Sequence, residues 1–279
     1  MGIDVKAGLV LVLLALTALS CDQETEGCLD FRALSVDLGA DNACEDCCEY
    51  PEFVLQLLPA ELLPDTLIRI TNQSIIAVSP GDSFRVLNYA LYLSDIGLEL
   101  EDGSRVELVD TLSFRQNSSE AFAREDVSLL RFNLFGNATQ RIGALLETRR
   151  VTGVSCRVGL PPQLAEVRPF AQIAGGLVAP SRDSLLLASD NLTLAGATVQ
   201  LEYPLGDTLQ PLRFAAAASD LVTFQFDEPL DLLSSYNLFV TVGIDVSRLP
   251  ELTAGNATLA QLLDVSISDS RVTSVRIAR

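Results

Sequence analysis

Short apolar runs separated by turn residues make up most of the chain from residue 53 onward. The runs are rich in Val, Leu, Ile, Phe and Thr, and Gly, Asp, Asn and Pro stand between them. Such spacing predicts antiparallel β-strands, and we expect only one or two helical turns, at Thr258 to Leu263. The expected strands are Phe53 to Leu58, Ser83 to Leu100, Val106 to Leu112, Ser128 to Leu134, Val151 to Leu160, Asn191 to Tyr203, Leu221 to Phe226, Tyr236 to Asp245 and Asp264 to Ile277.

Local patterns refine two of these strands. Ser83 to Leu100 has two candidate breaks, at Asn88 and Asp95, and Asp102-Gly103 after it is a strong hairpin signal. In Val154-Ser-Cys-Arg-Val158, alternation places Ser155 and Arg157 on the face opposite to Val154, Cys156 and Val158. Many short strands with few helices predict an all-β fold: an antiparallel β-sandwich, immunoglobulin-like or jelly-roll-like, over residues 53–279, preceded by a small Cys-rich segment.

The first twenty residues have the layout of a signal peptide. A polar start is followed by the apolar run Ala7 to Leu19, which is shorter than the roughly 20 residues that cross a bilayer. Ala18-Leu19-Ser20-Cys21 resembles the bacterial lipobox, in which the cysteine is acylated and becomes the new N-terminus. Several acyl chains give stable anchoring, so we expect membrane attachment through Cys21. An ordinary secretory signal cleaved beside Cys21 is the alternative.

The signal-peptide layout and the lipobox-like motif predict that the protein is located in the envelope of a Gram-negative bacterium. We expect an outer-membrane lipoprotein, in the periplasmic or the surface-facing leaflet. The inner membrane stays open as an alternative, because the acidic residues after Cys21 accompany different destinations in different lineages.

Four cysteines lie in the segment 21–52, which we expect to hold the lipid anchor, a tether and a Cys-rich part. In an oxidising compartment, Cys28, Cys44, Cys47 and Cys48 are candidates for two disulfides. A bond between adjacent Cys47 and Cys48 would be strained, which leaves two pairings open. Cys156 is then left over as a buried, inert thiol.

Metal binding by this segment is an alternative interpretation. Cys44-x-x-Cys47 has the spacing of half a zinc knuckle, so the four thiolates could instead hold a metal ion. Calcium prefers carboxylate and carbonyl oxygen, and weak candidates for it are Asp30, Asp37, Asp41 and Asp46. We predict that the protein has no resident cofactor, and binding of copper or of calcium are the two alternatives.

Composition excludes several classes of function. The 279 residues carry a formal net charge of −18, and nucleic acid is not an expected partner because phosphate binding requires clustered Lys and Arg. The chain has no histidine and no tryptophan, which excludes Ser-His-Asp and Cys-His catalysis and His-ligated zinc. We nominate no catalytic residue. A carboxylate-based hydrolase remains an alternative, because 37 acidic residues are present.

Several short motifs resemble one family of exported proteins. They are Val86 to Leu98 followed by Asp102-Gly103, Arg141-Ile-Gly143, Thr152 to Leu160, and Phe239 to Leu249. Together they are similar to the MbnP-like family, β-sandwich proteins named for a periplasmic copper-binding member. The resemblance implies the fold and an exported location. Copper-binding members use histidines and a modified tryptophan, and this chain has neither, so no copper ligand is carried over.

The function that follows is a non-enzymatic, lipid-anchored envelope protein that binds a ligand or an envelope protein partner. Copper binding or trafficking is the first alternative.

Overall fold

The structure is a computed structural model and describes residues 24–44, 46–115, 122–146, 148–161, 173–174, 195–214, 220–233, 235–254 and 258–278. The chain divides into two compact units, Met1–Tyr50 and Pro51–Arg279. Over the described ranges, none of the helices combines the length and the apolar character that crossing a membrane requires.

The N-terminal unit is small and is held together by turns and disulfides. Its strands β1 (Glu26–Gly27) and β2 (Asn42–Ala43) form a short parallel pair. Disulfide bonds join Cys28 to Cys48 and Cys44 to Cys47. With so few buried side chains, covalent links supply constraint that a hydrophobic core would otherwise give.

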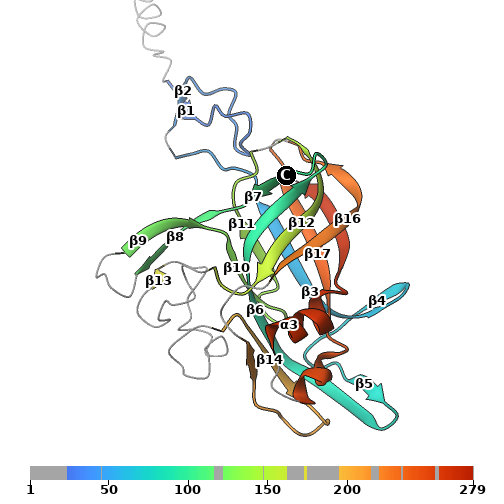
Figure 1. Cartoon of the computed structure of the whole chain (residues 1–279). Coiled ribbons are helices and arrows are strands. Elements are labelled where there is room, and N and C mark those ends of the chain that lie inside the picture. The colour runs from blue at the N-terminus through green and yellow to red at the C-terminus, as the bar shows by residue number, and fades with distance from the viewer. Residues whose placement is uncertain are drawn as a thin grey trace, which may run out of the picture. The chain divides into compact units, whose positions relative to one another are not determined.

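Two main sheets build the larger unit (Figure 1). One has the order β11 (Thr139–Ile142), β3 (Phe53–Leu63), β17 (Asn237–Asp245) and β18 (Arg271–Ala278), with β4 (Thr66–Arg69) also paired to β3. The other has the order β15 (Leu212–Phe214), β14 (Ala197–Glu202), β6 (Asp82–Leu100), β12 (Arg150–Val158) and β16 (Leu221–Asp231). On β6 it also carries β5 (Ile76–Ser79), β7 (Arg105–Glu107) and β10 (Leu129–Asn133). A small third sheet contains β13 (Ile173–Ala174), β8 (Asp110–Arg115) and β9 (Phe122–Val127).

Side chains of both main sheets meet in one hydrophobic core. Phe53, Leu55 and Leu57 alternate along β3 and are buried, as are Leu91 and Leu93 on β6. Val54 on β3 and Tyr92 on β6 are buried as well, so both strands are covered on their two faces at these positions. The prediction of an all-β sandwich is confirmed.

Strand β6 is 19 residues long and runs through both candidate breaks. Its register with β14 shifts next to Asn88, and its register with β12 shifts at Asp95 and Ile96. Asp95 has a φ of 51°, which is uncommon for a residue other than glycine. Both positions are therefore bulges, which bend a strand without ending it.

Three expectations from the sequence need correction. The pairing of β3 with β17 is parallel, not antiparallel. The expected strand Val106 to Leu112 divides into β7 and β8. The strand expected at Asp264 to Ile277 begins only at Arg271, as β18, because its first residues continue the helix α3 (Leu259–Leu262) into the π-helical turn η4 (Leu263–Ile267).

A capping box explains the start of this helical segment. The Thr258 hydroxyl accepts from the Gln261 amide while the Gln261 side chain accepts from the Thr258 amide. Val265 and Ile267 are buried, so their apolar pattern belongs to a helix packed on the core. A 3₁₀ segment, η3 (Leu249–Ala254), precedes it.

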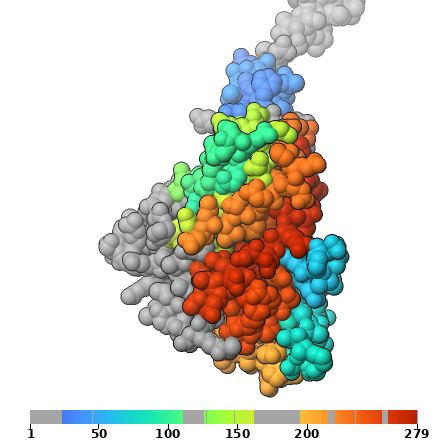
Figure 2. All heavy atoms as spheres, turned by 45° about the vertical axis from the view of Figure 1, so that its right-hand side comes forward, coloured from blue at the N-terminus to red at the C-terminus, as the bar shows by residue number. Residues whose placement is uncertain are grey.

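The C-terminal part of the chain lies beside two hairpins on the surface of the larger unit. Figure 2 shows it in orange to red, next to the β3–β4 and β5–β6 hairpins in cyan and turquoise. The Arg271 guanidinium at the start of β18 donates to the carbonyls of Leu63 and Pro64 in the β3–β4 turn, at 3.2 and 3.0 Å.

Candidate functional site

An apolar pocket lies in the larger unit beside the β6–β7 hairpin. Its volume is about 220 Å³. Side chains from β6, from β7 and the residues after it, from the segment after β11 and from the end of β16 form its wall: Leu98, Leu100, Val106, Leu108, Leu145 and Leu232. A concave and mostly apolar surface of this kind is the usual form of a small-ligand site.

Two backbone amides fix the segment after β11, one through a bond to the start of β8 and the other through a bond to Pro51. The Gly143 amide donates to Oδ1 of Asp110 at 3.2 Å, and the Leu145 amide donates to the Pro51 carbonyl at 2.7 Å. Gly143 has a φ of 67°, a conformation that glycine adopts without strain. A Cβ atom at this residue would lie 3.4 Å from the Leu108 Cβ. The glycine thus allows the segment to pass closely over the wall of the pocket.

The mouth of the pocket combines exposed apolar side chains with a few charges. Ala144, Val109 and Leu146 line it and are exposed to solvent. Glu107 and Arg149 are its charged lining residues, and Nη1 of Arg149 lies 3.9 Å from Oδ2 of Asp102. The apolar part of a ligand can therefore enter the pocket while the polar end of the same ligand stays at the rim.

Asp110, which bonds to Gly143 beside the pocket, has a perturbed acidity. Partial burial raises the pKa of Asp110, the amide of Gly143 opposes that rise, and the nearby Glu52 carboxylate adds to it. The role that its contacts support is to hold the Gly143 turn.

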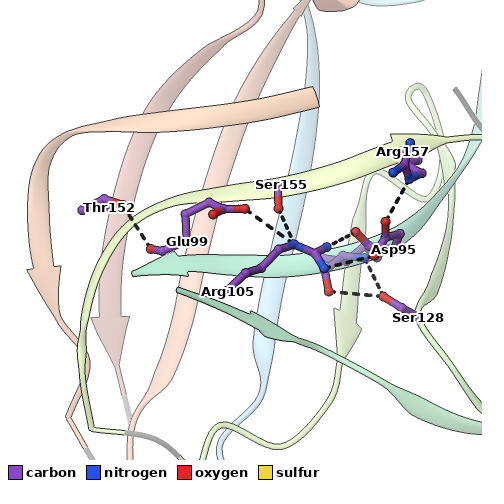
Figure 3. A network of polar contacts seen from close by, with 8 residues as sticks. Asp95, Glu99, Arg105, Ser128, Thr152, Ser155 and Arg157 are labelled. Carbon is purple, nitrogen blue, oxygen red and sulfur yellow. Dashed lines mark hydrogen bonds and ion pairs between the residues drawn. The ribbon is translucent and has the colours of Figure 1, made fainter. Parts of the chain in front are cut away.

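A polar network joins charged side chains of β6, β7 and β12 (Figure 3). Nε of Arg105 donates to Oγ of Ser155 at 2.8 Å and lies 3.5 Å from Oε1 of Glu99. The same guanidinium bonds to the Asp95 carbonyl, and its Nη1 lies 3.1 Å from Oδ1 of Asp95. Nε of Arg157 donates to Oδ2 of Asp95 at 2.9 Å.

This network also fixes the bulge in β6. Oγ of Ser128 accepts from the Ile96 amide at 2.6 Å and the Asp95 amide donates to the Ser128 carbonyl at 3.1 Å. A Cβ atom on Gly97 would lie 2.5 Å from Nε of Arg105, so the guanidinium occupies the space that a side chain would need. The strained Asp95 is thus held by bonds from three directions.

The network does not supply the chemistry of the hydrolase alternative. Asp95 and Glu99 are the two carboxylates that it brings together, and each is paired with an arginine. An arginine from a neighbouring strand thus lies against each of the two carboxylates. Its contacts are those of a group that positions strands.

The four cysteines of the N-terminal unit have one of the two pairings that the sequence leaves open. The sulfurs of Cys44, Cys47 and Cys48 lie within 4.8 Å of one another, and within the described part of the chain they are the only such group of potential metal ligands. All three are oxidised here, Cys44 with Cys47 and Cys48 with Cys28, so the thiolates of the zinc alternative are not present in this state.

The four candidate calcium ligands are not gathered into one group among the described residues. Asp30 binds the Arg32 guanidinium through both carboxylate oxygens and accepts from the Tyr50 hydroxyl, which holds the pKa of Asp30 well below its usual range. Asp37 accepts from the Gly39 amide and Asp41 from the Thr25 amide. Asp46 is exposed. Asp30 and Asp37 thus stabilise their own turns, and Asp41 joins its segment to Thr25, 16 residues earlier.

Of the remaining two cysteines, Cys156 lies among the described residues. Cys156 is a free thiol on β12 and is fully buried, and desolvation raises its pKa to about 12. Its side chain belongs to the core, while Ser155 and Arg157 on the other face join the polar network. Cys21 and the signal sequence 1–20 lie outside the described residues.

Sequence reasoning missed the pocket and the network. Leu98 and Leu100 alternate along β6, and Gly143 follows a short strand, but nothing in the sequence shows that they share a pocket with Leu232. The alternation in Val154 to Val158 was the one available signal for the network.

Comparison with known proteins gives one structural similarity. No family model matches the chain, and no curated protein matches it in sequence. Among solved structures, the chain is similar to MbnP from Methylosinus trichosporium, with 14% sequence identity and a TM-score of 0.45, over 73% of this chain and 78% of that one. Membership in the MbnP-like family stays a prediction.

Proposed function

We propose that this chain is a non-enzymatic binding protein, lipid-anchored in the outer membrane of a Gram-negative cell envelope, that takes an apolar group into the pocket beside β7. The observation that carries the binding role is the pocket itself, with its leucine-rich wall and a volume of about 220 Å³. Removing an apolar group from water into such a site is favourable by roughly 25 cal/mol per Å² of buried apolar surface.

Binding is a better interpretation of this pocket than catalysis. Glu107 and Arg149 are its charged lining residues, and the Arg149 guanidinium lies near Asp102. The chain has no histidine to act as an acid or base near neutral pH. A carboxylate and a guanidinium at the rim can orient the polar end of a ligand, either a small molecule or an apolar side chain of an envelope protein.

The pocket is tested with the neutral fluorescent probe N-phenyl-1-naphthylamine. We expect its fluorescence to rise on binding to the wild-type protein. Ala144→Phe places a ring at the mouth and should weaken the probe's affinity by roughly tenfold or more, because the ring fills space that the ligand needs. Ala77→Phe adds the same ring to an exposed position on β5 and should leave the affinity unchanged.

Two results would count against the pocket. One is no probe binding to the wild-type protein. The other is equal loss of affinity in Ala144→Phe and Ala77→Phe.

The anchor is a second part of the proposal and rests on the run Ala18-Leu19-Ser20-Cys21 that follows the apolar segment. Cells that express the chain and are fed a labelled fatty acid should incorporate the label, and Cys21→Ala should abolish it. Cys156→Ala removes a cysteine elsewhere and should leave the label in place. Equal labelling of the wild type and Cys21→Ala would show that Cys21 is not the attachment site.

A further inference from the structure

We propose that the Cys44–Cys47 disulfide is redox-active and exchanges two electrons with a dithiol protein that carries basic residues around its thiols, while Cys28–Cys48 is retained as the structural link of the N-terminal unit. The two bonds have different surroundings. In the first bond Cys47 is exposed and Cys44 is half-buried, whereas in the second Cys48 is half-buried and Cys28 is 1% exposed, so only the first bond includes an exposed residue. An incoming thiol can therefore reach a sulfur of the first bond directly.

The two bonds also constrain the chain to different extents. Cys44 and Cys47 are three positions apart, and Cys28 and Cys48 are 20 positions apart. In the loop-entropy account, a disulfide restricts the unfolded chain more as the loop that it closes becomes longer. Opening the short loop should cost the unit less than opening the long one.

Other contacts hold both ends of the Cys44–Cys47 loop in place. The Cys44 amide donates to the Gly27 carbonyl at 3.1 Å. The Ser35 hydroxyl donates to the Cys47 carbonyl at 3.0 Å and accepts from the Glu49 amide at 2.8 Å. Because these bonds do not involve sulfur, the two thiols should stay close together after reduction and be ready to form the bond again.

The exchange is balanced as two thiol–disulfide steps. A thiolate of the partner attacks the exposed Sγ of Cys47, a mixed disulfide forms, and Cys44 leaves as a thiolate that takes a proton from water. The second thiol of the partner, as a thiolate, then attacks the partner's own sulfur in the mixed disulfide and releases Cys47. The partner ends as a disulfide, and Cys44 and Cys47 end as two thiols.

Charge around the loop indicates the kind of partner. The residues between the two cysteines are Glu45 and Asp46, and Glu49 follows Cys48. Residues 24–50 contain eight acidic residues and one basic residue, Arg32, which is paired with Asp30. Such a surface repels a thiol compound or protein with additional negative charge and attracts one with positive charge near its thiol, and the effect weakens as salt is added.

The first test is selective reduction of the full chain carrying Cys21→Ser, which removes the N-terminal thiol. After limiting treatment with dithiothreitol under native conditions and alkylation with iodoacetamide, peptide mapping should find the label on Cys44 and Cys47. The label on Cys28 and Cys48 should be at least about tenfold lower, because their bond is less accessible. Equal labelling of all four cysteines, or no labelling of Cys44 and Cys47, would overturn the proposal.

The second test measures whether the Cys44–Cys47 disulfide reacts faster with a cationic thiol than with an anionic one. At low salt, cysteamine, a cationic thiol, should reduce Cys44–Cys47 several-fold faster than 3-mercaptopropionate, an anionic thiol, after correction for the thiolate fraction of each. Asp46→Asn should narrow this ratio, because it removes a charge from the loop. Asp65→Asn removes the same charge from the β3–β4 turn and should not change the ratio. Equal rates for the two thiols would refute the basic partner.

Discussion

The side chain of Cys156 shows how strongly one buried position can be coupled to pH. It lies on β12 among core side chains and has no exposed surface. Desolvation raises its pKa from 9.0 to about 12, with a smaller opposing effect of the Arg105 charge. The thiol therefore keeps its proton in the folded protein at pH values where the unfolded chain has lost it.

The sign of the resulting pH dependence follows from this difference. Below about pH 9 both states are protonated at Cys156 and the contribution to stability is complete. Between about pH 9 and 12 the unfolded state releases the proton first, so rising pH favours unfolding by on the order of 1 kcal/mol per pH unit. We expect Cys156→Ala to flatten the fall in unfolding free energy between pH 9 and 10, measured by urea denaturation. A parallel fall in both proteins would contradict this.

Alternation along a strand was sufficient to predict the two faces of β12. It placed Cys156 inward and Ser155 with Arg157 on the other side, as the structure has them. It could not predict that Arg157 reaches Asp95, because that contact depends on the register between β12 and β6. Register is a property of paired strands, and one sequence segment does not contain it.

At the scale of elements, β6 is the strand on which the second sheet is assembled. It pairs with β14 and β12, and with β5, β7 and β10. The residues Asn88 and Asp95 were correctly singled out as irregular, but the irregularity is a bulge in each case and the strand continues. A polar residue within an apolar run indicates that a strand is irregular at that position. Whether the strand ends there depends on the neighbouring strands that pair with it on both sides.

The helical segment after Thr258 is where local pattern failed. Asp264 to Ile277 alternates well enough to suggest a strand, yet its first residues complete a helix that begins at a capping box. Burial of Val265 and Ile267 against the core favours the helix over the local strand preference. Tertiary packing commonly overrides propensity in this way.

Removal of Arg105 should destabilise the sheet through the network. Arg105→Gln leaves Asp95 and Glu99 without their shared guanidinium in a partly buried position, so we expect the free energy of unfolding to fall by about 1 to 3 kcal/mol. Arg141→Gln is the matched control, because its pair with Glu52 is exposed, with 64% and 41% of the two side chains accessible. Exposed pairs contribute roughly 0 to 1 kcal/mol.

Urea denaturation of the two variants checks this comparison. Equal losses in Arg105→Gln and Arg141→Gln would show that the network adds no more than a surface ion pair.

At the scale of the whole molecule, the two units are stabilised by different means. Both disulfides lie within Met1–Tyr50. The described core of the larger unit is formed by residues from Phe53 onward. The chain continues into the larger unit through Pro51 and Glu52, which already bond within it, to Leu145 and Asn237.

This division predicts that the larger unit folds without the N-terminal unit. A chain that starts at Pro51 should unfold cooperatively with a Tm within about 3 °C of the corresponding transition in the full chain, because no described core residue and no disulfide of the larger unit is removed. A chain that starts at Gln56 also loses Phe53 and Leu55, both fully buried on β3. Its Tm should fall by on the order of 10 °C or more, because each lost core side chain costs roughly 2 to 5 kcal/mol. Circular dichroism melting of the full chain and of the two shortened chains gives the three Tm values. If the chain that starts at Pro51 loses as much Tm as the chain that starts at Gln56, the N-terminal unit is required for the sandwich to fold.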